Sequence, residues 1–340
     1  MPILLSQALS ASGVTGPIFA DRQITIAWDG ANGFGATGPT VDFFDDFRNG
    51  TDGVAHGLAD PVIGSWDSRP GLPKVVDEQS LTKGLSLKVI DAVMKQIRFA
   101  FPGPRTEFFL CYWLRCDINW VDIVAGNFKS TWILDQAGSF SGTDDEYDNC
   151  FPQRAGGSGW EVSGNDTQRH WQWTTAAINK DLWHRAALWE KDIESNPDPG
   201  PLDMKFFAQR LTPGLANERT DVPNKPTSDP QGMFTVGGGD PPASTSVGLI
   251  NFPGFEGFGG QAWYDEIYIA SGPGAAARVE IGNNSDYDSC TRLAIATITA
   301  HSNEEITCTL RDGGFGTFAN QHMHITDLDN AQVGTSRLIS

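Results

Sequence analysis

The chain is poor in basic residues and in long apolar runs, and each shortage excludes a class of function. It holds 24 Lys and Arg against 42 Asp and Glu, which gives a net charge of −18. Because nucleic-acid binding needs clustered basic side chains to neutralise phosphates, this balance argues against a nucleic-acid partner. It also argues against adhesion to anionic lipid. No apolar run approaches the roughly 18 residues of a membrane span, so no membrane partner is expected.

Helical periodicity and a disulfide framework are missing as well. The five cysteines are an odd number without metal-type spacing, and they predict thiols at synthesis. The sequence leaves undecided whether Cys290 and Cys308 form a disulfide. Alternating apolar residues, together with 38 Gly and 20 Pro, predict an all-β protein. A length of 340 residues suits two domains.

The two ends of the chain are predicted to form one small domain. Residues 23–28 alternate like a strand, and so do residues 277–282, 305–310 and 321–326. Neither end has enough apolar faces to close a core alone. We therefore expect residues 1–40 and 272–340 to form one small Ig-like β-sandwich that mounts the rest of the chain.

Residues 41–271 are predicted to form a larger domain inserted between these ends. Apolar alternation marks strands at 84–90, 95–101, 107–115, 129–134, 170–175, 183–189 and 202–209, and most strongly at 260–270. Eight or more antiparallel strands fit two stacked sheets in a jelly roll.

Short motifs in both parts resemble known families. Phe44-Asp-Asp-Phe47 and Trp263-Tyr-Asp-Glu-Ile-Tyr-Ile-Ala270 resemble the ends of the concanavalin A-like lectin/glucanase superfamily, which includes laminin-G-like domains. Gly33-Phe-Gly35 and Arg278-Val-Glu-Ile-Gly282 are similar to the IPT/TIG immunoglobulin-like domain. The wide separation of the last two motifs implies that the jelly roll is inserted into the Ig-like domain.

The motifs of degrading enzymes in this superfamily are largely absent. Laminarinase-type members carry E-x-D-x-x-E, whose alternate carboxylates share one strand face, and this chain has none. Alginate-lyase-type jelly rolls carry R-[ST]-E-[LV]-R, of which Arg105-Thr-Glu107 matches the first part only. A lyase must neutralise a uronate carboxylate and move a proton. Arg105 and Glu107 therefore define the alternative reading, a polysaccharide-degrading lyase or glycosidase. Otherwise they are surface strand residues.

A cluster of aromatic residues is the candidate glycan site. Trp171 and Trp173 fall at alternate strand positions and so share one face, and Arg169 and His170 are their polar neighbours. Indole rings can stack on the apolar faces of sugars. The competing interpretation is that these side chains fill the space between the sheets.

Calcium is the expected cofactor, in a structural role. The resemblance implies an ion held by Asp265 in the last strand, with Asp45 or Asp46 nearby in the first. Two acidic loops, 144–149 and 283–288, also offer several oxygens, and calcium takes six to eight oxygen ligands. The alternative is that these carboxylates are solvated.

A lectin-like domain on an Ig-like domain, without the motifs of degrading enzymes, favours a non-enzymatic surface protein. The N-terminus has no basic segment followed by a signal-type apolar run, so we expect cytoplasmic synthesis and release by another route. A bacteriophage virion decoration or fibre protein with a lectin-like head fits, with other virion or surface proteins as partners and several copies in the assembly. A degrading enzyme and a bacterial adhesin are the competing hypotheses, because fold alone does not fix function.

Overall fold

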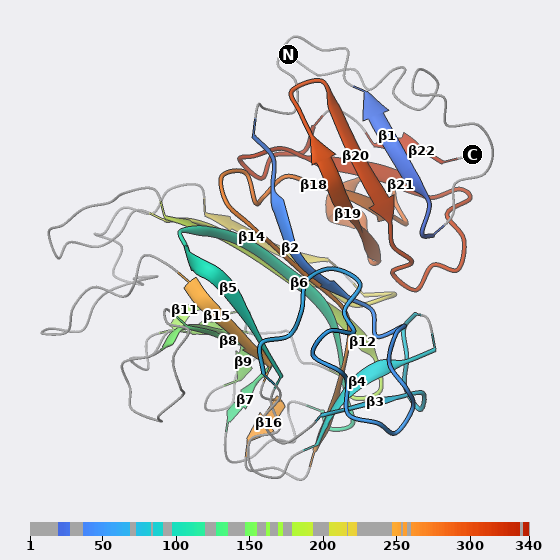
Figure 1. Cartoon of the computed structure of the whole chain (residues 1–340). Coiled ribbons are helices and arrows are strands. Elements are labelled where there is room, and N and C mark those ends of the chain that lie inside the picture. Colours follow the sequence, from blue (N-terminus) through green and yellow to red (C-terminus); the bar gives the residue numbers. More distant parts are fainter. Residues whose placement is uncertain are drawn as a thin grey trace, which may run out of the picture.

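The protein is all-β, as the sequence predicts. The computed structural model describes residues 20–27, 37–68, 73–82, 84–90, 97–119, 127–134, 147–154, 161–163, 169–172, 179–192, 204–215, 217–222, 247–252, 254–256, 260–333 and 336–339. Within these residues the one helical element is the 3₁₀ helix η2, Tyr287–Ser289. No helix described here is long and apolar enough to cross a membrane. Three antiparallel sheets account for the rest of the architecture (Figure 1).

The central sheet belongs to the jelly roll and contains its longest strands. It runs in the order β14-β13-β12-β6-β17-β4-β3, and β2 pairs with β17 beside this path. The bounds are β2 Thr40–Asp45, β3 Lys74–Val76, β4 Ser86–Ile90, β6 Glu107–Cys116, β12 Trp183–Asp192, β13 Met204–Leu211, β14 Glu218–Val222 and β17 Gln261–Ser271.

A second sheet completes the jelly roll. Its order is β11-β10-β9-β8-β15-β5, with β7 pairing β9 and β16. The bounds are β5 Ile97–Arg105, β7 Asn127–Lys129, β8 Trp132–Leu134, β9 Tyr147–Arg154, β10 Glu161–Ser163, β11 Arg169–Gln172, β15 Val247–Phe252 and β16 Gly254–Glu256. Aromatic and aliphatic side chains fill the space between the two sheets; they include Phe43, Trp66, Phe99, Tyr112, Phe252 and Tyr264.

The third sheet, here called the small sheet, combines strands from both ends of the chain. Its order is β1-β20-β19-β18-β21-β22, with bounds β1 Gln23–Ala27, β18 Arg278–Gly282, β19 Leu293–His301, β20 Glu305–Leu310, β21 His322–Thr326 and β22 Arg337–Leu338. The N-terminal strand enters through antiparallel pairs from Gln23 with Thr309 to Ala27 with Glu305. Ile24 and Ile26 thereby reach a core shared with β18–β21.

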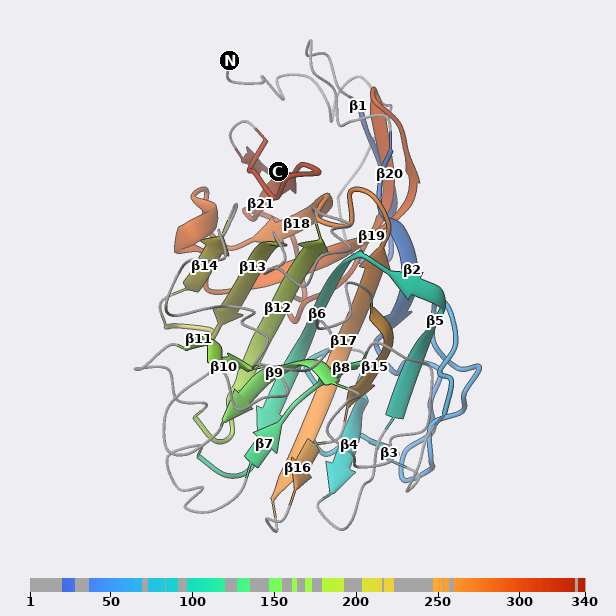
Figure 2. The same ribbon diagram turned by 90° about the vertical axis from the view of Figure 1, so that its left-hand side faces the viewer.

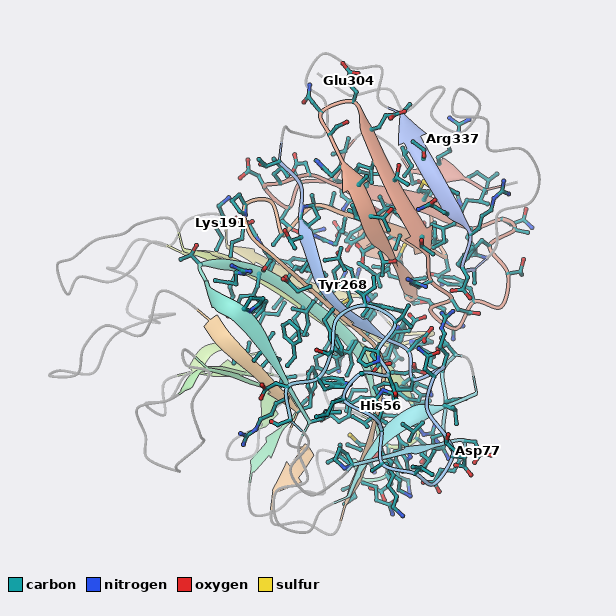
Figure 3. The ribbon with its side chains drawn as sticks, in the orientation of Figure 1. His56, Asp77, Lys191, Tyr268, Glu304 and Arg337 are labelled. Atoms are coloured by element: carbon teal, nitrogen blue, oxygen red, sulfur yellow. The ribbon has the colours of Figure 1, made fainter. Side chains whose placement is uncertain are left out.

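The small sheet packs on the face of the central sheet that points away from the second sheet. This buried contact, here called the seam, includes jelly-roll side chains of β2, β6, β12, β13 and β17 and three residues of the small-sheet part: Phe44, Phe109, Cys111, Ala187, Trp189, Phe207, Tyr268, Ala270, Ala275, Ala276 and Ile295. Figure 2 shows β18 and β19 next to the ends of β12, β6 and β17, and Figure 3 shows Tyr268 between the two parts. The central sheet is therefore covered on both faces where β2, β6, β12, β13 and β17 meet the small sheet.

Several details differ from the sequence-based expectations. The stretch predicted as one strand at 129–134 is divided between β7 and β8. Strand β19 lies in the middle of the small sheet and was not predicted. Cys290 and Cys308 are both free thiols in buried positions. They therefore do not form the disulfide that the sequence left undecided. Burial raises the pKa of each of these two thiols to about 12.

Candidate functional site

The glycan candidates lie at one edge of the second sheet. Arg169, His170 and Trp171 belong to β11, the last strand of that sheet. Trp171 stands opposite Val162 of β10, and the register shifts directly after this pair. A bulge of this kind bends the strand and redirects side chains. Trp173 lies outside the described residues, so the predicted pair of indoles stays a prediction.

Glu107, from the alternative lyase motif, is buried in the seam. Its carboxylate accepts hydrogen bonds from the Trp189 indole N–H at 3.3 Å and from the Gly274 backbone N–H at 3.2 Å. The ammonium of Lys191 lies 3.2 Å from its second oxygen. The side chain is 4 % exposed. Glu107 therefore connects the jelly roll to the segment that leads into the small sheet.

Arg105 lies apart from these contacts, at the end of β5. Its backbone stands opposite Val247 of β15. Burial raises the pKa of Asp42, and the side chain of Ser271 and the charge of Arg105 both oppose that shift. Arg105 thus acts electrostatically on a carboxylate of β2, whereas Glu107 contacts Gly274 and β12.

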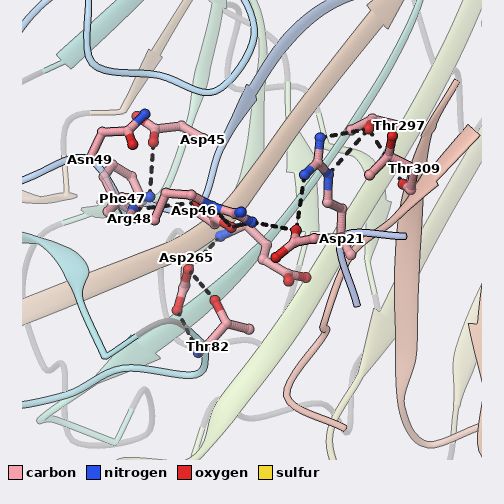
Figure 4. A network of polar contacts seen from close by, with 12 residues as sticks. Asp21, Asp45, Asp46, Phe47, Arg48, Asn49, Thr82, Asp265, Thr297 and Thr309 are labelled. Carbon is pink, nitrogen blue, oxygen red and sulfur yellow. Dashed lines mark hydrogen bonds and ion pairs between the residues drawn. The ribbon is translucent and has the colours of Figure 1, made fainter. Parts of the chain in front are cut away.

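Asp265, the first calcium candidate, already accepts four hydrogen bonds. One carboxylate oxygen accepts the backbone N–H groups of Leu81 and Thr82 at 2.9 and 3.1 Å. The other accepts the Thr82 hydroxyl at 3.2 Å and the Glu266 N–H at 2.8 Å. A carboxylate offers about four acceptor positions, so all of them are in use. Asp265 fixes the loop after β3 onto β17 (Figure 4).

Asp45 and Asp46 are also engaged by protein donors. One oxygen of Asp45 accepts the Phe47 N–H at 2.9 Å. The other accepts the Trp66 indole N–H at 2.9 Å and lies 2.8 Å from the His56 ring. Asp46 binds the guanidinium of Arg48 through both oxygens. His56 and Trp66 were not singled out in the sequence, because no local motif links them to Asp45.

Arg48 continues this network toward the small sheet. Its guanidinium binds Asp21 at 2.8 Å, and Asp21 also accepts Arg311 at 3.2 Å. Arg311 donates in turn to the Thr297 hydroxyl of β19 at 2.8 Å. Figure 4 shows this chain of contacts running from the end of β2 to β19.

A bulge in β17 brings another carboxylate to the same region. The register shifts between Asp265 and Tyr268, and Glu266 has a φ of 46°. One oxygen of Glu266 accepts the Gly313 N–H at 2.8 Å. Burial raises the pKa of Asp265 to about 7, and burial together with the neighbouring Asp265 raises that of Glu266 well above its usual range. Among the described residues, no group of three or more His, Cys, Asp or Glu side chains has a metal-binding arrangement.

The calcium prediction is checked by thermal unfolding. If Asp265 and the segment of Asp45 and Asp46 bind calcium, the ion must replace some of the hydrogen bonds described above. Stabilisation of about 2.7 kcal/mol is expected when free calcium is about 100-fold above its dissociation constant. The measurement is the melting temperature with calcium and with chelator, and Asp265→Asn should abolish the difference. Identical melting under both conditions would contradict a calcium site.

Neither a family model nor a curated protein sequence matches this chain. Among solved structures it is similar to a marine alginate lyase from Aplysia kurodai, with 7 % identity, 68 % of this chain and 100 % of the lyase covered, and a TM-score of 0.45. It is similar to domain 4 of an extracellular arabinanase from Geobacillus stearothermophilus, with 10 % identity, coverage of 69 % and 94 %, and a TM-score of 0.36. It is also similar to lectin I from Ulex europaeus, with 10 % identity, coverage of 60 % and 94 %, and a TM-score of 0.33. At these identities the likeness concerns the sandwich fold alone.

Proposed function

We propose that this protein is a non-enzymatic, glycan-binding surface protein, carried on a bacteriophage virion as a decoration or fibre component. The jelly roll is the head that meets the glycan. The small sheet and its connections are the base that contacts other virion proteins. Several copies act together in the assembly.

The position of Glu107 is the main support for a binding rather than a degrading function. Its carboxylate is occupied by Trp189, Gly274 and Lys191 and is covered by the seam. A catalytic carboxyl must instead come within hydrogen-bond reach of its substrate. A polysaccharide would reach this carboxylate only by displacing its contacts with β12 and with the segment that leads into the small sheet.

The seam also supports separate roles for the two parts, with glycan binding by the jelly roll and attachment by the small sheet. One face of the central sheet is already taken up by the small sheet, which leaves the second sheet and its edge strand β11 on the side away from the base. The net charge of −18 keeps many copies soluble and mutually repelled before assembly.

Glycan binding is tested on an array that includes uronans, β-glucans and bacterial surface polysaccharides. Removing an aromatic anchor from a binding surface costs about 2 kcal/mol, close to a 30-fold loss of affinity. We expect this loss for Trp171→Ala and for Trp173→Ala. Leu182→Ala, which shortens an exposed side chain just before β12 of the central sheet, serves as the control and should bind normally. A blank array for the unaltered protein would contradict the glycan-binding role.

Degradation is tested with the same polysaccharides. We expect neither unsaturated products nor new reducing ends after prolonged incubation. Product release that disappears in Arg105→Ala or Glu107→Ala would favour the degrading enzyme instead. The virion role is tested separately, by mass spectrometry of purified particles, and particles that lack this chain would contradict it.

A further inference from the structure

A buried ion pair joins the jelly roll to the small sheet across the seam. Arg185 of β12 donates to one oxygen of Glu280 of β18, and its other terminal nitrogen donates to Gln209 at 3.0 Å. Arg185 is 1 % exposed and Glu280 is 0 % exposed. The jelly roll thus inserts an arginine into the small sheet.

An arginine of the small sheet likewise contacts side chains of the jelly roll. Arg278 of β18 donates to the second oxygen of Glu280 at 2.8 Å, and its guanidinium lies over the jelly-roll rings of Phe109 and Phe207 at 4.8 and 5.0 Å. Tyr287 donates to the same Glu280 oxygen at 2.8 Å. Arg278 also donates to Ala276 and Asn330.

The contacts are therefore reciprocal, and one carboxylate serves both arginines. We propose that Arg185, Arg278 and Glu280 form an interlock that fixes a single orientation of the jelly roll on the small sheet. This role does not depend on whether the head binds glycan. It concerns the direction in which the head leaves its base.

The buried charges of the interlock explain why one orientation of the jelly roll on the small sheet would be favoured over others. Apolar side chains such as Phe109 and Tyr268 tolerate many relative positions, because hydrophobic attraction has no direction. Two buried guanidinium groups and one buried carboxylate are stable only where their partners meet. A slip of one residue along β18 would turn Arg278 and Glu280 to the opposite face of their strand. Wrong orientations would leave buried charges unpaired.

The test compares the interlock with an apolar seam. Spin labels are attached at Asp77→Cys and Glu304→Cys, two exposed sites at far ends of the molecule (Figure 3), in a Cys150→Ser background. Electron–electron double resonance then measures the distance distribution between the labels. We expect one narrow distribution for the protein with its interlock. We expect a broadened or split distribution for the combined variant Arg185→Met, Arg278→Leu and Glu280→Leu, with circular dichroism unchanged.

The control is a partly exposed ion pair outside the seam, Lys88 with Glu78, replaced by Met and Leu. It should leave the distance distribution unchanged. A narrow, unshifted distribution in the apolar interlock variant would overturn the proposal, because hydrophobic packing alone would then fix the orientation. If the combined variant does not fold, Glu280→Gln with the same labels replaces it. A narrow, unshifted distribution in Glu280→Gln would overturn the proposal equally.

Discussion

Removal of residues 272–340 should leave a chain that aggregates rather than a stable jelly roll. The deletion uncovers the seam face of the central sheet, which includes Phe109, Trp189, Phe207 and Tyr268. Exposing a fully buried large apolar side chain costs about 1.5–3 kcal/mol each, and contiguous exposed patches of this kind promote aggregation. It also removes β20, the partner of β1.

The measurement is the soluble fraction after expression, followed by size-exclusion chromatography and thermal unfolding. The control is full-length protein with Val54→Ser, which changes a side chain that is already exposed and should behave normally. A truncated chain that is soluble, monodisperse and melts at the full-length temperature would show that the jelly roll folds independently.

Loss of the Glu280 carboxylate should be the most damaging single substitution at the seam. In Glu280→Ala, Arg185 and Arg278 remain buried without their shared partner. Breaking a buried ion pair from one side typically costs 3–5 kcal/mol. Urea denaturation should show a loss of about this size, whereas Glu78→Ala, which removes the exposed partner of Lys88, should cost at most about 1 kcal/mol. Equal losses in both variants would contradict the assigned role of Glu280.

The same carboxylate predicts a pH dependence. Burial alone would raise the pKa of Glu280, but Arg185, Arg278 and the Tyr287 hydroxyl lower it from the ordinary 4.5 to about 2. This difference corresponds to stabilisation on the order of 3 kcal/mol. Because the folded-state pKa is the lower one, the stabilisation is fully present above about pH 4.5 and is lost as the pH falls through 2. Glu280→Gln should lack this part of the acid-dependent loss.

The sequence predicted strands where apolar and polar residues alternate, and also where a long aromatic run is buried on both faces, as in β17. Residues 305–310 form β20 as expected, because Ile306, Cys308 and Leu310 alternate toward the core. The missed strand β19 lacks such alternation. Ala294, Ala296 and Ile298 face the small-sheet core while Ile295 faces the seam, so both sides are buried. Alanine is also depleted in strands.

The polar part of the seam could not be predicted for a related reason. Arg278 and Glu280 alternate with Val279 and Ile281 along β18, which is the pattern of a strand with one solvent-exposed face. Here the polar face instead meets Arg185, which lies 95 residues away in the sequence. The sequence holds no signal for such a partner. The candidate residues Asp45 and Asp265 were identifiable as acids, but their donors Trp66 and Thr82 lie 21 and 183 residues away in the sequence.

Burial of the central sheet on both faces also bears on how this protein can evolve. Nine of the ten residues of β6 are buried, so neither set of alternating positions is open to neutral exchange. Ordinary sandwich strands accumulate substitutions on their outer face while the inner face stays constant. In β6 that freedom is absent, whereas β20 keeps exposed or half-exposed alternate positions. Lineages of this protein should therefore diverge in their surface loops long before they diverge in the strands where the jelly roll meets the small sheet.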